Sequence, residues 1–287
     1  MTIRFLILSD THDEYFHVDG AQNNIDVVLH CGDMTMIGGL SNYKKAISRL
    51  AAINAEIKIV IPGNHDVSLD PEWWAANLIE DEDDPSEPEK AAALFNNARE
   101  SGIQFLSGAG AHTFTLKTGL SFSLYASPYT PDFNGYAFPY FPHEDVFNEA
   151  ATRIPEHVAI IMTHGPGLTS YTLDLGRDGE HCGCPKLFNA VRRVKPLIHC
   201  FGHIHEGYGV QSISWEEEDG NDITVEDVGV ATCRVADSKK RRGQTILVNA
   251  AISRHGEELN KAWMIDLEFA DDGKASWESG IQDISIG

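Results

Sequence analysis

The sequence lacks any long hydrophobic run, which excludes a chain built around membrane-spanning helices. Its first residues, MTIRFLILSDTHD, contain only a short apolar run that Arg4 interrupts and that no small-residue cleavage site follows. A spanning helix needs about 20 apolar residues in succession, and no segment reaches that length. We therefore expect a cytoplasmic protein that does not associate with membranes.

Basic residues are also scarce. The chain has 22 Lys and Arg against 43 Asp and Glu, which gives a formal net charge of −21. A surface this acidic repels nucleic acid polymers and anionic membranes, so neither is an expected partner. A small phosphate ester remains compatible if the site supplies cations of its own. The basic run KKRR at 239–242 is interpreted as a charged loop end, with a nuclear signal or an anion-binding patch as alternatives, so a nuclear location stays open.

Cysteine is rare, and its distribution excludes a disulfide framework. The five cysteines are odd in number and scattered in spacing. Cys182 and Cys184 form a C-x-C pair, which is more often incidental than a zinc site. No cysteine lies in a nucleophile signature, so covalent thiol catalysis is not expected.

Short apolar segments rich in β-branched residues predict buried strands. They cover residues 3–10, 26–33, 57–66, 158–166, 197–206 and 245–252. Helical patterns cover 40–54, 88–101 and 184–194, a hairpin pattern covers 112–127, and WMIDLEF near the C-terminus indicates a late strand. This alternation predicts α/β layers around one mixed sheet or two packed sheets.

Two segments read as surface insertions rather than domain linkers. Residues 80–89 are acidic and contain proline, and residues 214–243 form a long stretch with an acidic first part and a basic end. Strand patterns resume after each of them. We therefore expect residues 1–287 to form a single domain.

Five of the predicted strands end in Asp, Asn or His. These ends read Asp10-Thr-His12, Gly32-Asp33, Gly63-Asn64-His65-Asp66, Thr163-His164-Gly165 and Gly202-His203-Ile204-His205. Any one of them is explained by a polar turn or by a satisfied core histidine, but five in one chain are not. Loops that follow the carboxyl ends of strands converge on one crevice of an α/β sheet, so we expect these side chains to meet.

The converging side chains offer carboxylate, imidazole and amide oxygen ligands, which suit Mn, Fe, Zn or Ni. The candidate ligands are Asp10, His12, Asp33, Asn64, His164, His203 and His205. Seven ligands are too many for one tetrahedral ion but suit two ions that share a bridging carboxylate. Two-metal sites hold their ions about 3.5–4 Å apart and act on both oxygens of an in-line displacement at phosphorus.

This ordered set of motifs resembles the calcineurin-like metallophosphoesterase superfamily from about residue 3 to about residue 270. THGP at 163–166, VKPLIHCFGHIHEGYG at 194–209 and the later LVNAAI are similar to a narrower group, the animal metallophosphoesterase-domain-containing proteins and their fungal relatives. The resemblance implies a four-layer αββα sandwich, in which two mixed β-sheets pack face to face and helices flank them.

The resemblance also implies roles for individual residues. Asp10, His12 and His205 would hold the first ion, and Asn64, His164 and His203 would hold the second. Asp33 would bridge the ions, and a hydroxide between them would attack phosphorus in line. His65 would be the catalytic general acid, and Asp66 would either orient His65 or cap the turn. We expect two divalent transition-metal ions, with Mn preferred and Fe, Zn or Ni as alternatives.

The expected function is hydrolysis of small phosphodiesters, and the narrower resemblance extends this to cyclic nucleotides. Alternatives are a phosphomonoesterase or Ser/Thr-type protein phosphatase and, less favoured, a metal-binding scaffold without catalysis. The oligomeric state stays open.

Two further segments are candidates for contacting the rest of the substrate. Arg177 and His181, in the glycine-rich loop 167–184, are candidates for binding a phosphate oxygen, with a solvated Arg as the alternative. The aromatic stretch TPDFNGYAFPYFP at 130–142 either walls a pocket or packs an irregular loop, and loop packing is preferred.

Overall fold

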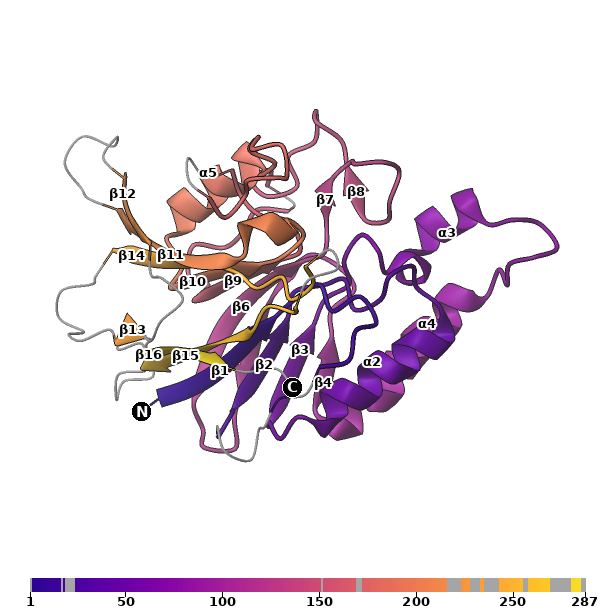
Figure 1. Cartoon of the computed structure of the whole chain (residues 1–287), viewed down its shortest axis with the longest axis horizontal. Coiled ribbons are helices and arrows are strands. Elements are labelled where there is room, and N and C mark those ends of the chain that lie inside the picture. Colours follow the sequence, from indigo (N-terminus) through magenta and orange to yellow (C-terminus); the bar gives the residue numbers. More distant parts are fainter. Residues whose placement is uncertain are drawn as a thin grey trace.

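The computed structural model describes residues 2–16, 18, 24–150, 152–168, 172–215, 223–227, 233–234, 243–254, 258–268 and 280–284. Within this part of the chain, two large mixed sheets pack together and a two-stranded sheet lies apart (Figure 1). The first sheet has the strand order β13 (Cys233–Arg234), β16 (Gly280–Ile284), β15 (Ala262–Glu268), β1 (Thr2–Leu8), β2 (Val27–His30), β3 (Ile57–Val60) and β4 (Ile103–Phe105).

The second sheet has the same number of described strands. Its order is β12 (Ile223–Asp227), β11 (Gly209–Trp215), β14 (Gln244–Asn249), β10 (Ile198–Phe201), β9 (Ile160–Thr163), β6 (Ser121–Ser127) and β5 (Gly110–Thr115). The small sheet pairs β7 (Thr130–Pro131) with β8 (Pro139–Tyr140). In both large sheets the central strands run parallel, namely β1 to β4 and β6, β9, β10 and β14.

Helices cover the outer faces of both large sheets and complete four layers (Figure 1). Helices α2 (Leu40–Ala52) and α4 (Glu87–Asn97) pack on the first sheet, and α5 (Pro185–Val194) packs on the second. The other helical elements of the described residues are α3 (Pro71–Asn77) and the short 3-10 turns η1 (Val67–Leu69), η2 (Ala98–Ser101) and η3 (His205–Gly207). The expected αββα sandwich of two mixed sheets flanked by helices is confirmed.

Strand β1 shows why these apolar runs lie in the interior. Its Ile3, Phe5 and Ile7 belong to the core between the sheets, whereas Leu6 and Leu8 face α2 and α4. Successive side chains point to opposite faces of a strand, so a strand buried on both sides needs an unbroken apolar sequence. That requirement explains why the parallel strands were visible in the sequence.

The strands start where the sequence indicates but end earlier. Each of the five ligand-bearing segments leaves the sheet before its polar residues, which therefore lie in loops at the carboxyl edge. The acidic segment at 80–89 is not all loop, because α4 already begins at Glu87 and carries Pro88 in its first turn. Within 214–243, residues 223–227 form β12 and pair with β11, while the KKRR run lies outside the described residues.

The two sheets meet at the edge where the ligand-bearing loops gather. Ser9, just past β1, forms an isolated parallel bridge with Ala251, just past β14. The Ser253 amide donates to the Asp10 carbonyl oxygen at 3.1 Å. The carboxyl ends of β1 and β14 are thereby joined across the seam between the sheets.

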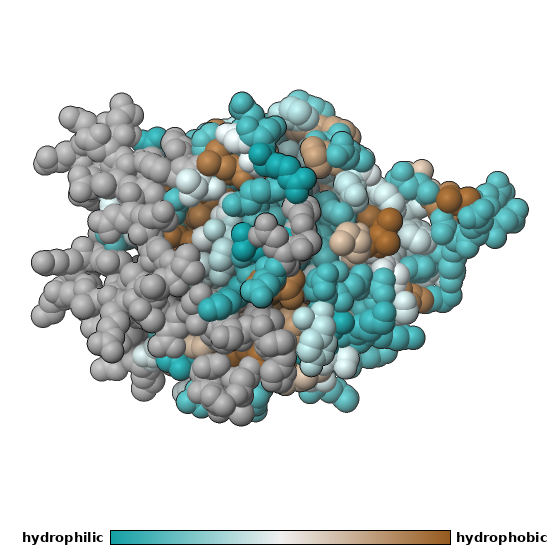
Figure 2. All heavy atoms as spheres, viewed as in Figure 1, coloured by the Kyte–Doolittle hydropathy of each residue, from teal (hydrophilic) through white to brown (hydrophobic). Residues whose placement is uncertain are grey.

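The described helices include none with the length and apolar character needed to cross a bilayer. On the face drawn in Figure 2, the described surface is mostly hydrophilic, and hydrophobic residues form small separate patches.

Candidate metal centre

The polar strand ends converge at one edge of the sandwich. Asp10 and His12 follow β1, Asp33 follows β2, and Asn64 follows β3, all from the first sheet. From the second sheet, His164 follows β9, and His203 and His205 follow β10. These polar side chains are largely buried. Loops from both sheets thus bring together residues that are nearly 200 positions apart.

The first cluster consists of Asp10, His12 and His205, whose potential ligand atoms lie within 4.8 Å of one another. Asp10 Oδ1 is 3.3 Å from His205 Nε2 and 3.9 Å from His12 Nε2. The two Nε2 atoms of His12 and His205 face each other at 3.2 Å. Two imidazole nitrogens and a carboxylate aimed at one point form a donor set typical of a divalent transition metal.

The second cluster consists of Asp33, His164 and His203, again with ligand atoms within 4.8 Å. Asn64 belongs beside it, because its Oδ1 lies 2.8 Å from His164 Nε2. Asp33 Oδ2 is 3.3 Å from His164 Nε2 and 3.7 Å from His12 Nε2. The Asp33 carboxylate therefore lies between the two clusters. The structure brings together all seven ligand candidates that the sequence indicated.

Backbone carbonyl groups orient two of the histidines for metal binding. The Nδ1 of His12 lies 3.2 Å from the Thr35 carbonyl oxygen, and the Nδ1 of His164 lies 2.9 Å from that of Cys31. A carbonyl oxygen only accepts, so Nδ1–H is the donor and Nε2 is the nitrogen that faces the cluster. Metal-binding histidines are oriented in this way, and the residues present fit a pair of divalent ions.

The charges within the clusters are strongly coupled. Burial raises the pKa of Asp33, but His164 outweighs it and brings the pKa down to about 2. Burial lowers the pKa of His164, but the Asp33 carboxylate outweighs it and raises the pKa to about 9. Burial likewise raises the pKa of Asp10, yet His205 and the other imidazoles hold it well below its usual range. The clusters thus keep their carboxylates ionised, and Asp33 favours positive charge on His164.

Four of the ligand candidates have a left-handed backbone. The φ angles are 53° at Asp10, 41° at His12, 53° at Asp33 and 68° at His203. Few non-glycine residues adopt this region, Asp and His more readily than most, and such conformations cluster at functional sites. The left-handed turns let each chain leave its strand and still direct its side chain into the centre.

Glycines next to the ligands make room for them. A Cβ atom on Gly32 would lie 2.5 Å from His164 Nδ1, and one on Gly63 or Gly202 would overlap the carboxylate of Asp33 or Asp10. These glycines therefore allow the backbone to approach the acidic and imidazole side chains. Their positions beside the polar residues were visible in the sequence.

His65 lies at the rim of the two clusters and is half-buried. Its amide donates to Asp33 Oδ1 at 2.8 Å, and its Nδ1 lies 2.8 Å from the Met36 carbonyl oxygen. Its ring contacts the His12 ring, with centroids 4.8 Å apart, and the Tyr136 ring, with centroids 4.4 Å apart. With Nδ1 directed at a carbonyl, Nε2 is the nitrogen available for proton transfer.

Asp66 fixes the backbone of the site rather than the His65 ring. Its carboxylate accepts from the amides of Gly63 at 2.9 Å, Met34 at 3.2 Å and Thr35 at 3.0 Å, and from the Thr35 hydroxyl at 2.8 Å. It therefore joins the loop that carries Asp33 to the loop that carries Asn64 and His65. Of the two roles weighed from the sequence, the structure favours capping, because the His65 ring is held by Met36.

The two substrate-contact candidates lie on a loop next to His205. Arg177 is 74% exposed and pairs with Glu206, at 3.6 Å from Nε to the carboxylate. His181 Nδ1 is 3.0 Å from the carboxylate of the buried Asp174. Neither residue is a member of a metal cluster. Arg177 is thus solvated and partly neutralised, which agrees with the alternative weighed for it.

Several supporting residues were not identified from the sequence. Buried His30 and His199 contact the hydroxyls of Thr11 and Thr163, which adjoin the ligands, at 3.1 and 2.9 Å. Asn249 donates to the Ile204 carbonyl oxygen at 2.7 Å and so supports the turn between His203 and His205. Each of these residues is a polar residue within an apolar strand, and this contrast could have marked it in the sequence. The sequence does not reveal which loop such a residue contacts.

Comparison with known proteins agrees with this geometry. Metallophosphoesterase domain-containing protein 1 of Homo sapiens is 34% identical over 218 residues, which cover 73% of this chain and 62% of that protein. The chain thus spans less than two thirds of that relative's length. A UPF0046 protein of Caenorhabditis elegans is 30% identical over 216 residues, covering 72% of this chain and 70% of that protein.

A solved crystal structure superposes with a TM-score of 0.56 at 12% identity, covering 99% of this chain and 100% of the other, which supports the fold alone. The family model described as calcineurin-like phosphoesterase matches residues 3–207. This match runs from the first strand through the last of the clustered histidines. The chain therefore belongs to the calcineurin-like phosphoesterase family.

Proposed function

We propose that this chain is a dinuclear metal-dependent phosphoesterase that hydrolyses small phosphodiesters, with cyclic nucleotides as the first class to test. The position of Asp33 carries this proposal. Its Oδ2 lies near an imidazole of each cluster, 3.3 Å from His164 and 3.7 Å from His12. A carboxylate shared in this way is what two adjacent ions need as a bridge.

The remaining ligands divide between two ions. Asp10, His12 and His205 would hold one, and Asn64, His164 and His203 would hold the other. When bound, the ions would lower the pKa of a water molecule toward about 7 and offset negative charge on the phosphoryl oxygens. Carboxylate, imidazole and amide ligands suit Mn, which we prefer, as well as Fe, Zn or Ni.

His65 would act on the leaving group. The Met36 carbonyl oxygen accepts from Nδ1 and leaves Nε2 of the protonated ring to give its proton to the departing oxygen. General acid catalysis of this kind contributes about 10²–10⁴-fold to the rate. Contacts with the rings of His12 and Tyr136 restrict the imidazole further.

Charge near the site supports a diester rather than a monoester. A phosphodiester carries one negative charge at neutral pH, whereas a monoester carries nearly two and needs more positive charge around it. Arg177, the basic candidate on the neighbouring loop, already pairs with Glu206. The resemblance to metallophosphoesterase-domain-containing proteins also favours a diester substrate.

A single domain over residues 1–287 and a cytoplasmic location stay predictions.

The test is hydrolysis by protein of known metal content. Purified protein is loaded separately with Mn, Fe, Zn or Ni, its bound metal is measured by elemental analysis, and bis-p-nitrophenyl phosphate is compared with p-nitrophenyl phosphate. We expect about two ions per chain and a higher kcat/KM for the diester. Protein that binds no metal after loading would contradict the proposal, and a preference for the monoester would contradict the substrate class.

A further inference from the structure

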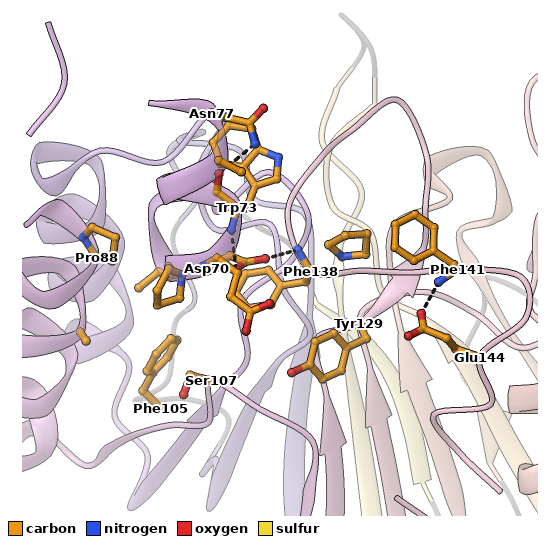
Figure 3. Close-up of a pocket in the computed structure, with 16 residues that line it drawn as sticks. Asp70, Trp73, Asn77, Pro88, Phe105, Ser107, Tyr129, Phe138, Phe141 and Glu144 are labelled. Carbon is orange, nitrogen blue, oxygen red and sulfur yellow. Dashed lines mark hydrogen bonds between the residues drawn. The ribbon is translucent and has the colours of Figure 1, made fainter. Parts of the chain in front are cut away.

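A concave site lies between α3, α4 and the small sheet of β7 and β8. Its volume is about 680 Å³, and its walls carry aromatic side chains from four segments of the chain (Figure 3). They are Trp73, Phe105, Tyr129, Phe138 and Phe141. A cavity of this size and character is typical of a site for a small organic molecule. Of the aromatic stretch at 130–142, Phe138 and Phe141 thus line a pocket, whereas Tyr136 and Tyr140 pack against the cores as the preferred interpretation of the sequence had it.

The pocket is preformed, because hydrogen bonds hold its opposite walls together. Asp70 caps α3 by accepting from the amides of Glu72 and Trp73, each at 3.1 Å, and also accepts from the Phe138 amide at 2.7 Å (Figure 3). The Trp73 indole Nε1 donates to the Gly135 carbonyl oxygen at 2.6 Å. A ligand would meet walls already in place, so little ordering free energy opposes its binding.

The charges around the pocket have one sign. Asp70, Glu72 and Glu144 line it, and the lining residues that the structure describes include no Lys, Arg or His. Lys186 is close by, but its ammonium donates to the carbonyl oxygens of Pro142 and Glu144. Burial, with added repulsion from Asp70 and Glu72, raises the pKa of Tyr129, which agrees with a negative potential inside the pocket.

We propose that this pocket binds a small organic cation, a quaternary or protonated amine with an apolar body. Ring faces attract a cation through their quadrupole, and the exposed Glu72 in the lining supplies a full opposite charge. A phosphate ester would be repelled here, so the pocket takes a ligand of a different class from the substrate proposed for the metal centre. No residue of either metal cluster lines the pocket, and binding should not depend on bound metal.

The test uses three probes that share a benzyl or phenyl body and differ in charge. Benzyltrimethylammonium, benzyl alcohol and benzenesulfonate are titrated into the purified full chain by isothermal titration calorimetry, before and after metal loading. We expect saturable binding of the cation at least about tenfold tighter than that of the alcohol, and weaker binding as salt is raised. The sulfonate should not bind. Metal loading should leave the cation affinity unchanged, which keeps this result independent of the phosphoesterase proposal.

Matched variants locate the site. Trp73→Leu should weaken cation binding about fivefold, the equivalent of one cation–π contact of about 1 kcal/mol. Glu72→Gln, at an exposed position where folding is not at risk, should also weaken it. Trp74→Leu and Glu89→Gln are controls, because these residues lie on α3 and α4 but do not line the pocket. Equal affinity for the cation and the alcohol, no saturable cation binding, or unchanged affinity in both Trp73→Leu and Glu72→Gln would overturn the proposal.

Discussion

The ring of Tyr136 packs against the ring of His65, with centroids 4.4 Å apart and planes 34° apart. The same loop is anchored where the Ala137 amide donates to the Asn64 carbonyl oxygen at 3.2 Å. Residues from the aromatic stretch therefore hold the proposed general acid and the backbone of a proposed ligand. The position of His65 depends on a segment far from it in the sequence.

Replacing His65 should slow catalysis without removing metal. His65→Ala is expected to lower kcat for bis-p-nitrophenyl phosphate by about 10²–10⁴-fold, because the leaving oxygen loses its proton donor. Metal content measured on the same samples should equal that of the wild type. Tyr136→Leu, which removes only the supporting ring, should cause a smaller fall. An unchanged rate in His65→Ala would refute the assignment.

Asp33→Asn tests the bridge between the clusters. The amide oxygen still accepts from the His65 amide, but the shared negative charge is lost. Bound metal should fall from about two ions per chain to one or fewer. Asp132→Asn, a change at an exposed position away from both clusters, serves as the control. Two tightly held ions in Asp33→Asn would rule out the bridging role.

Metal affinity should rise with pH. Without metal, the pKa of His164 is raised to about 9, so at neutral pH a proton occupies the nitrogen that a metal needs. Binding releases this proton, and the affinity should increase at least about tenfold per unit between about pH 6 and about pH 8. The slope is a lower bound because burial lowers the pKa of His205 but Asp10 outweighs it and raises this pKa as well. Competition with a chelator of known affinity measures the slope. A flat profile across this range would show that metal binding does not release a proton from His164.

Buried His199 should make folding sensitive to acid. Burial lowers its pKa to about 3, below the value of about 6.5 in the unfolded chain. Stability is therefore full above about pH 6.5 and falls as pH drops toward 3, with a loss of about 2 kcal/mol at about pH 5. His199→Gln retains a donor to the Thr163 hydroxyl but does not titrate. Urea unfolding of both proteins with chelator present should show that the free energy of unfolding depends less on pH in the variant. Parallel curves for the two proteins would disprove the role of His199.

Gly202→Ala should disrupt the first cluster. The new methyl group would overlap the Asp10 carboxylate and Ser9, both of which are buried. We expect the free energy of unfolding to fall by about 1–3 kcal/mol, and metal binding to weaken. Gly108→Ala is the matched control, since nothing lies within 4 Å of its Cβ position and it should change stability by less than about 0.5 kcal/mol. Similar stability of the two variants would contradict the close packing described here.

Sequence reasoning located the elements that are buried on both faces. The continuous apolar runs of β1, β2 and β9 predicted strands, and the polar residues after them predicted a shared site, because both signals are local. Strand β11 was missed, since VQSISW is interrupted by the polar residues Gln211, Ser212 and Ser214 and continues into a segment interpreted as an insertion. The pocket at Asp70 and Phe138 was also missed as a site, because it depends on a hydrogen bond between residues 68 positions apart.

The bridge between Ser9 and Ala251 has a consequence for synthesis of the protein. Asp10 and His12 leave the ribosome before their partner His205, which follows His12 by 193 residues, and before the strand β14 that anchors their loop. A growing chain therefore holds four of its seven ligand candidates once Asn64 has emerged, and it completes the set only 141 residues later, at His205. Retention of metal by a newly made molecule thus reports that both sheets have closed upon one another.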